Sequence, residues 1–214
     1  VLGDPVSVAT ALAIVCGTVG VLLLSPPDKQ HPLRALVTGW ATKSAAIGLA
    51  SGTCFAFSVI GYRGAALSLE GTSFLLAAAV TQLFPGAQCG IGPATDEGFF
   101  YDFVVARPFV PEDLEKIEAR MRELAQQDLP YERQIWPRQE AIAFFTRRGE
   151  PLKVQLIEEK TAGEQFVSCY TIKDRETFVD FCVGPHVPST SRLKAFKLTA
   201  ASNAYWKGDA KRQP

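Results

Sequence analysis

A carboxylate, a thiol and an imidazole lie close together near the end of the sequence, at Asp180, Cys182 and His186. They follow a predicted strand and flank the turn dipeptide Gly184-Pro185. Side chains at alternate positions of an extended segment point the same way, so these groups can face one pocket. Cys182 and His186 could form half of a zinc site, which would need two more ligands. The only other histidine in the sequence is His31. A polar pocket without metal and a purely structural histidine are the other interpretations.

Charge and cysteine content narrow the class of protein. The 214 residues carry 22 Lys and Arg against 22 Asp and Glu, so the formal net charge is zero. This balance excludes a uniformly basic nucleic-acid binder and an acidic disordered tail. Five scattered cysteines indicate free thiols in a reducing compartment rather than a disulfide scaffold. The charges are unevenly spread, because residues 1–80 hold only three acids and four bases.

Two uncharged runs of nineteen residues, 6–24 and 44–62, lie in this charge-poor part. Each approaches the roughly 20 residues that cross a bilayer core, and both are rich in small residues that let membrane helices pack closely. Lys29, Arg34 and Lys43 in the connector place it in the cytoplasm by the positive-inside rule. We therefore expect a two-helix membrane hairpin and membrane association through both runs. Two buried helices of a soluble domain are the alternative.

After residue 71 the pattern is that of a soluble α+β domain, an antiparallel sheet with packed helices. One helix is predicted to begin at Pro111, with acids in its first turn, and another to span 138–147, capped by Gly149. Val110 is a poor amino-terminal cap for the first of them. Short β-branched or aromatic runs predict strands. These runs are 88–91, 99–105, 131–136, 153–157, 166–172 and 178–181.

Five segments of this region resemble, in order, the second amino-terminal domain of bacterial threonyl-tRNA synthetases, an editing module shared with alanyl-tRNA synthetases. The similarity covers about 75–214, and its most specific parts are GPHVPST at 184–190 and AYWKGD at 204–209. These two parts belong to the matching segments 178–198 and 202–214. The other three matching segments are GIGPATDEGFFYDF (90–103), FVPEDLEKIEARMRELAQQDLPYER (109–133) and AIAFFTRRGEPLKVQLI (141–157).

The resemblance implies hydrolysis of the ester that links serine to the threonine tRNA, in a family that is cytoplasmic. One methyl group gives a binding pocket only about 1–3 kcal/mol of discrimination, so a second, size-excluding site has to remove the error. The chemistry needs a positioned water and neither a cofactor nor a metal is expected. Full-length members of the family are homodimers.

The resemblance also implies roles for individual residues. Lys153 matches a lysine that helps to hold the attacking water and supports charge developing at the ester. Asp180 and Cys182 match residues that contact the seryl group, and His186 matches a histidine near the terminal ribose or the water. These four form the predicted catalytic set. The predicted pocket lining consists of Gly92, Pro93, Phe100, Tyr101, Gly184 and Pro185.

Four positions depart from the family pattern. The family's domain opens on a helix that carries HxxxH, and Glu70 and Phe74 occupy those two places, so both histidines are absent. Glu70 can act as a base in principle, although it differs from histidine in reach and charge. Phe100 stands where a tyrosine is usual and Val183 where an arginine is usual. The sequence therefore predicts impaired deacylation.

Basic and aromatic residues are interleaved over 192–212. This composition suits phosphate contact and stacking on the unpaired 3′ end of a threonine tRNA, and a solvated edge is the alternative. The predicted tRNA-binding residues are Arg192, Lys194, Lys197, Tyr205, Trp206 and Lys207.

Residues 1–80, and within them the stretch 20–71, resemble a piece of the ten-helix EamA-like drug/metabolite transporters. Two spans cannot enclose a substrate path. We expect a transporter-like hairpin at 1–70 and an editing domain at 71–214 that stops before the family's aminoacylation domain, with the two resemblances meeting in the apolar string 73–80. The alternatives are a membrane-tethered tRNA-binding module without catalysis and a transporter fragment with a vestigial soluble half.

Overall fold

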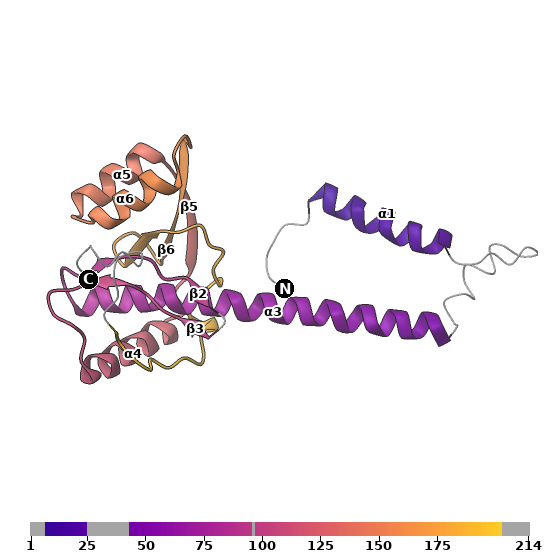
Figure 1. Ribbon diagram of the computed structural model, residues 1–214, viewed down its shortest axis with the longest axis horizontal. Coiled ribbons are helices and arrows are strands. Elements are labelled where there is room, and N and C mark those ends of the chain that lie inside the picture. Colours follow the sequence, from indigo (N-terminus) through magenta and orange to yellow (C-terminus); the bar gives the residue numbers. More distant parts are fainter. Residues whose placement is uncertain (1–6, 25–42, 96, 203–214) are drawn as a thin grey trace, which may run out of the picture. The chain divides into compact units, whose positions relative to one another are not determined.

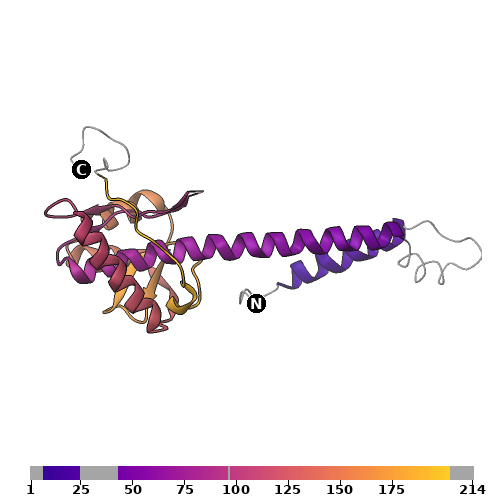
Figure 2. The same ribbon diagram turned by 90° about the horizontal axis from the view of Figure 1, so that it is seen from below.

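A computed structural model describes residues 7–24, 43–95 and 97–202 of the chain. The chain divides into two compact units, Val1–Gly61 and Tyr62–Pro214. The boundary falls inside one long helix, α3, which spans Lys43–Leu83 and is drawn in purple in Figures 1 and 2. Each unit is described by itself.

The first unit consists, in its described part, of helix α1 (Val8–Leu24) and the beginning of α3. Large apolar side chains on both helices are exposed, including Val8 at 78% and Phe55 at 73%. The predicted runs 6–24 and 44–62 fall largely on these helices, but the expected end near residue 62 is wrong because α3 continues to Leu83. Over the described residues 7–24 and 43–95 the structure therefore has one long helix and no clear two-helix membrane hairpin. Lys29 and Arg34 of the predicted connector, and His31, lie outside the described residues.

Within the described residues, one helical stretch, Ala46–Leu83, is long and apolar enough to cross a membrane. However, 61% of its most apolar window is buried inside the structure. The core helix of a soluble protein has the same length and composition, so this stretch is weak support for a membrane span.

The core of the second unit forms around the last part of α3. Every residue from 71 to 80 is buried, because this segment is surrounded on all sides by the sheet, by helix α4 and by loops. Helix α4 (Pro111–Gln126) contributes Ile117, Met121 and Leu124, which recur at spacings of three and four on its buried face. Its predicted start is confirmed. Val110 gives no side-chain cap, and instead its backbone N–H donates to Asp113 Oδ2 at 3.1 Å.

A three-stranded antiparallel sheet, ordered β5-β6-β7, forms the other layer. Its strands are β5 (Tyr131–Pro137), β6 (Phe166–Ile172) and β7 (Phe178–Phe181), which confirms three of the predicted strands. One face packs through Trp136, Cys169 and Val179 against helices α5 (Arg138–Arg147) and α6 (Pro151–Lys160), which lie beside β5 in Figure 1. The opposite face packs through Tyr131, Tyr170 and Ile172 into the cluster around α3.

Two predicted strands differ from the structure. The run 153–157 is helical, as part of α6, because Pro151 starts a helix and Lys153, Leu156 and Ile157 are buried at helical spacing. The run 99–105 is interrupted: β3 (Gly98–Phe99) pairs with β2 (Ala94–Thr95), whereas β4 (Phe103–Val104) pairs with β1 (Gln88–Cys89). The interruption places residues 100–102 between two short ribbons. Helix α5 is confirmed, and Gly149 follows it at φ +71°.

A short 3₁₀ turn, Thr190–Arg192, ties the chain after the sheet to α4. The Thr190 hydroxyl is fully buried, donates to Leu124 O at 2.8 Å and accepts from Leu129 N at 2.9 Å. One side chain therefore satisfies two backbone groups at the end of α4.

We predict that Thr190→Val lowers the free energy of unfolding by about 1–3 kcal/mol, since the isosteric side chain leaves Leu129 N without its acceptor and removes one of the two donors to Leu124 O, the other being Gln127 N. Urea denaturation measures the change. The matched control is Thr146→Val, which removes an exposed hydroxyl that donates to Ile142 O at 2.7 Å and should change stability by less than about 0.5 kcal/mol. Equal effects of the two replacements would contradict the role given to Thr190.

Candidate functional site

A buried lysine forms the centre of the site. Lys153, in the first turn of α6, is 2% exposed. Its Nζ donates to Asp180 Oδ2 at 2.8 Å, to Gly90 O at 2.6 Å and to the hydroxyl of Tyr101 at 3.0 Å. The Tyr101 hydroxyl in turn donates to Asp180. A buried charge is tolerated only when it is paired and hydrogen-bonded, so these partners are what allow the Lys153 amine to be buried.

The sheet and helix α3 position the partners of Lys153. Asp180 lies on β7 directly opposite Tyr170 of β6, and its second oxygen accepts from Phe181 N at 2.8 Å. The Ser73 hydroxyl of α3 contacts Gly92 O at 2.6 Å and Phe100 O at 2.7 Å, which holds the loop that carries Tyr101.

Gly92 is required by close packing in the same loop. A Cβ atom at this position would lie 2.1 Å from the ring of Tyr101 and 2.6 Å from the Ser73 hydroxyl. The loop backbone and the Tyr101 ring are therefore in direct contact, and no larger residue fits there without displacing the ring.

The second part of the site is a thiol–imidazole pair. Cys182 Sγ and His186 Nε2 are 3.2 Å apart, on either side of a turn that contains a cis Gly184-Pro185 bond. Gly184 has φ +66°, and a Cβ there would lie 2.5 Å from the Tyr170 hydroxyl. Burial, reinforced by Asp180 and Glu70, raises the pKa of Cys182 to about 11, so the thiol is protonated at neutral pH.

Aromatic rings surround His186. Its ring centroid lies 4.6 Å from those of Phe74 and Tyr170 and 5.6 Å from that of Tyr131. This burial lowers the pKa of the imidazole to about 4, so His186 is neutral at pH 7. Its Nδ1 atom is buried and has no hydrogen-bond partner among the described residues. One buried polar atom of the site thus has its hydrogen-bonding capacity unused among the described residues.

Glu70 and Phe74, where the sequence predicts a departure from the HxxxH pattern, lie on one face of α3, since residues four apart share a face. Phe74 is 2% exposed and packs on His186 and Phe178. Glu70 is partly buried, and its Oε1 accepts from Ala94 N at 3.3 Å. The helix therefore presents a phenyl ring, rather than a proton-accepting group, next to His186.

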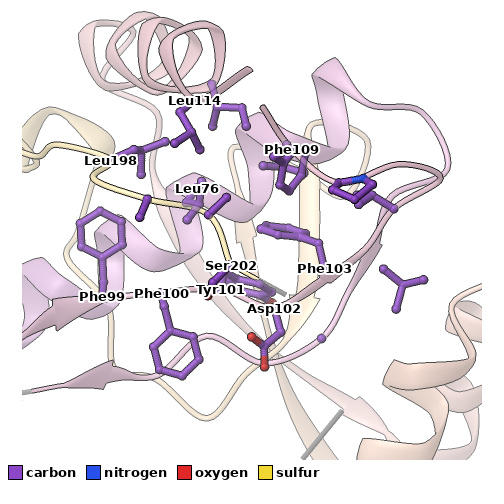
Figure 3. Close-up of a pocket in the computed structure, with 18 of the residues that line it drawn as sticks. Leu76, Phe99, Phe100, Tyr101, Asp102, Phe103, Phe109, Leu114, Leu198 and Ser202 are labelled. Carbon is purple, nitrogen blue, oxygen red and sulfur yellow. The ribbon is translucent and has the colours of Figure 1, made fainter. Parts of the chain in front are cut away.

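A cavity of about 620 Å³ lies on the other side of Tyr101 (Figure 3). Phe100, Tyr101 and Lys197 line it, whereas none of the four predicted catalytic residues does. Asp102 projects its carboxylate there, and partial burial raises the pKa of this group. Tyr101 is thus shared, because its ring borders the cavity and its hydroxyl belongs to the Lys153 cluster.

The remaining predicted residues are more scattered. Arg192 ends the 3₁₀ turn, Lys194 is exposed, and Lys197 forms an ion pair with Glu118 at 3.3 Å. Tyr205, Trp206 and Lys207 lie outside the described residues. Among the residues that the structure covers, no group of three or more His, Cys, Asp and Glu side chains is placed to hold a metal ion.

Sequence reasoning missed three contributors to the site. Gly90 contributes a backbone carbonyl, and because every residue has one, its type could not indicate this role. Ser73 lay in an apolar string that indicated only burial, and Tyr170 was part of a strand run whose facing residues could not be known before the register of β6 and β7. Pairing Tyr170 with Asp180 is what places this ring against His186.

Comparison with known proteins agrees with this architecture. Residues 167–213 match the family model of the threonyl and alanyl tRNA synthetase second additional domain. This part of the chain is such a second additional domain. Threonine–tRNA ligases are similar over a longer stretch: that of Azoarcus sp. (strain BH72) is 55% identical over 142 residues, or 66% of this chain and 22% of the relative. The ligase of Marinobacter nauticus is 54% identical over 138 residues, or 64% of this chain and 21% of the relative.

The ligase of Geobacter sp. (strain M21) gives the same picture, at 55% identity over 141 residues, or 66% of this chain and 21% of the relative. The chain spans about a fifth of the length of these relatives. Asp180, Cys182 and His186 lie within the matched residues 167–213, whereas Lys153 precedes them. Both the Lys153–Asp180 cluster and the Cys182–His186 pair depend on strand β7 and the turn that follows it.

We predict that the free energy of unfolding falls at acidic pH because His186 is held neutral in the folded state. The folded pKa of His186 is about 4, whereas an unfolded histidine titrates near 6.5, so below about pH 6.5 the unfolded chain binds the extra proton. This contribution to stability is complete above about pH 6.5 and is lost as the pH falls toward 4. Between pH 7 and pH 5 it amounts to about 2 kcal/mol.

Urea denaturation at both pH values tests this prediction, with His186→Gln as the comparison. Carboxylates titrate in both proteins, so the difference between them isolates the imidazole. The variant should lose less stability than the wild type between pH 7 and pH 5. The same loss in both proteins would show that His186 is not held neutral by burial.

Proposed function

We propose that the second additional domain of this chain is the editing region of a threonine–tRNA ligase and hydrolyses the ester of serine with the threonine tRNA. The observation that carries this proposal is the buried Lys153 amine, which has three acceptors beside the Cys182–His186 pair. The similarity to threonine–tRNA ligases supports the choice of tRNA.

The charges of the cluster suit ester hydrolysis. A water oxygen attacks the ester carbonyl, its proton passes to a base, and the ribose oxygen leaves and takes up a proton, which releases serine and tRNA. The Lys153 amine lies in a dry environment, where a positive group stabilises the negative charge that develops on the carbonyl oxygen. The neutral His186 imidazole contacts the Cys182 thiol through Nε2, so a water or a ribose hydroxyl beside the thiol would meet this neutral pair rather than an imidazolium.

Discrimination between serine and threonine follows from the walls of the proposed pocket. Tyr101 is fixed by Asp180 and Lys153, and the Cys182 thiol is fixed by His186, so neither side chain can move aside easily. A rigid wall of this kind accepts the serine hydroxymethyl group and clashes with the additional methyl of threonine.

We also propose that this chain hydrolyses the ester slowly. General bases act within hydrogen-bond reach of the proton they remove. Phe74 offers no acceptor where it meets His186, and the Glu70 carboxylate is engaged by Ala94 N. The water then has fewer groups to orient and deprotonate it.

The test is a deacylation assay on threonine tRNA mischarged with serine. We expect the full chain to release serine faster than the uncatalysed rate, and the double replacement Glu70→His with Phe74→His to increase the rate at least about a hundredfold, the lower end of what a positioned acid–base group contributes. A chain that does not hydrolyse the ester, in both the wild type and the double variant, would contradict the proposal.

Lys153 provides the control for this assay. Lys153→Met combined with Asp180→Leu removes both charges and leaves no unpaired buried ion, so the fold is retained while hydrolysis is lost. Lys160→Ala, which removes an exposed lysine from the same helix, should leave the rate unchanged.

A second candidate function, membrane tethering, is favoured by the first unit. Exposed apolar side chains occur on all sides of the first part of α3, including Ile47, Phe55, Phe57 and Ile60. A helix that is apolar all round fits lipid better than it fits a single protein groove. We propose that 1–70 forms a membrane-associated segment and that 71–214 is the tRNA-binding part.

We predict that the full chain floats with phosphatidylcholine vesicles in a density gradient, whereas Phe55→Asp combined with Phe57→Asp weakens this association. Each charge costs about 2.5–3.5 kcal/mol near the centre of a bilayer. Exposed Glu115→Gln on α4, far from the apolar segment in sequence, serves as the control. If the wild-type chain stays at the bottom of the gradient, the segment is not a membrane anchor.

A further inference from the structure

The sheet face that carries Asp180 extends well beyond the proposed site. Residues opposite each other in an antiparallel pair share a face, so Arg133, Tyr170 and Asp180 form one cross-strand row. The next row contains Ile135 and Ser168, and Cys182 continues it, because its backbone N–H donates to Ser168 O at 3.3 Å. Pro137 and Phe166 form the last row.

Only part of this face is covered. Tyr131, Tyr170 and Ile172 pack into the cluster around α3, whereas Ile135 is 55% exposed and Phe166 is 56% exposed. Helices α5 and α6 lie against the opposite face (Figure 1) and bury neither of these two side chains. We call Arg133, Ile135, Phe166 and Ser168 the open half of the face.

The open half is positively charged next to its apolar side chains. Arg133 is exposed, and its Nε donates to Ser168 Oγ at 3.0 Å, which holds the guanidinium across the face. Within the part of the chain that the structure describes, Arg133 forms no salt bridge. Glu132 belongs to the opposite face, and Asp180 is already paired with Lys153. The charge of Arg133 is therefore not neutralised locally.

We propose that the open half binds the unpaired nucleotides that precede the terminal adenosine of the aminoacyl-tRNA, with Phe166 and Ile135 against the bases and Arg133 on a phosphate. This inference rests on the proposed function, because it takes the terminal ester to be held beside Asp180 and Cys182. A cation with a neighbouring aromatic ring is the combination that single-stranded nucleic acids require. A purely apolar partner would leave Arg133 desolvated without a counterion.

The dimensions fit this occupant. Neighbouring strands are about 4.8 Å apart, so the backbone of Arg133 lies roughly 10 Å from that of Asp180. From the row of Tyr170 to that of Phe166 the strand advances by four residues, or about 14 Å. At about 3.4 Å or more per nucleotide this is enough for roughly two to four nucleotides. Of the other residues predicted to bind tRNA, Arg192, Lys194 and Lys197 lie on the 3₁₀ turn and on the segment that follows it, not on the sheet.

The test measures binding of a 5′-fluorescein-labelled single-stranded RNA that ends in CCA, with adenosine as competitor. We expect Phe166→Ala and Arg133→Ala each to weaken binding of the RNA by the full chain about tenfold. Phe166→Trp should retain binding, whereas Phe166→Leu should not, because leucine keeps apolar area but has no ring to stack. Arg133→Ala should also reduce the slope of log K against log salt by about 0.7, the value for one lost phosphate contact.

Arg147→Ala is the matched control, since it removes an exposed arginine from α5 on the opposite side of the sheet and should change neither affinity nor slope. Wild-type affinity in Arg133→Ala and Phe166→Ala would overturn the proposal, as would RNA that binds no better than adenosine. A change of oligomeric state in these variants with unchanged RNA binding would overturn it too, and would identify the face as a contact between two copies of the chain.

Hydrolysis of two substrates separates this inference from the proposed function. Seryl-adenosine lacks the preceding nucleotides, so Arg133→Ala should lower kcat/KM for mischarged tRNA about tenfold and leave seryl-adenosine unaffected. Equal losses for both substrates would overturn the inference while the proposed reaction stands. If the chain binds the RNA through this face but hydrolyses neither substrate, the reaction is wrong and the binding surface remains.

Discussion

The Lys153–Asp180 ion pair is the interaction on which the second unit depends. It joins helix α6 to strand β7, and through Gly90 and Tyr101 it also holds the loop between the two short ribbons. Removing one partner of such a buried pair costs about 3–5 kcal/mol, because the other charge is left without compensation. Replacing both partners by apolar residues of similar volume is often neutral for stability, so the pair matters chiefly because neither partner can be lost alone.

Helix α3 provides the support for this pair. Its last turns are buried on every side, and a single hydroxyl, Ser73, contacts the carbonyls of Gly92 and Phe100 and so holds the loop that carries Tyr101. Phe74, on the same turns, completes an aromatic enclosure around His186. The enclosure stabilises the core and at the same time keeps the imidazole neutral. Packing and proton chemistry are therefore coupled at this position.

Local patterns in the sequence were sufficient for most of the second unit. Proline and acids in the first turn located α4, and β-branched runs located β5, β6 and β7. The run 153–157 failed because short apolar segments satisfy both helical and extended periods, and Pro151 was the signal that should have decided it. The convergence of Lys153, Tyr101 and Asp180 depends on contacts between residues as much as 79 positions apart, which periodicity cannot supply. The continuation of α3 past residue 62 was missed because charge-free length was taken for a helix boundary.

The register between β5 and β6 has a consequence of its own. Successive side chains of β5 point to opposite faces of the sheet. Arg133 and Ile135 face one side, while Glu132, Gln134 and Trp136 face the other. A slip by one residue would bring Glu132 or Gln134 to the face of Asp180 and move the arginine behind it. The register of the strands, rather than the amino-acid composition, therefore decides whether that surface is positively charged. A chain with no net charge can in this way present a cationic patch without any excess of basic residues.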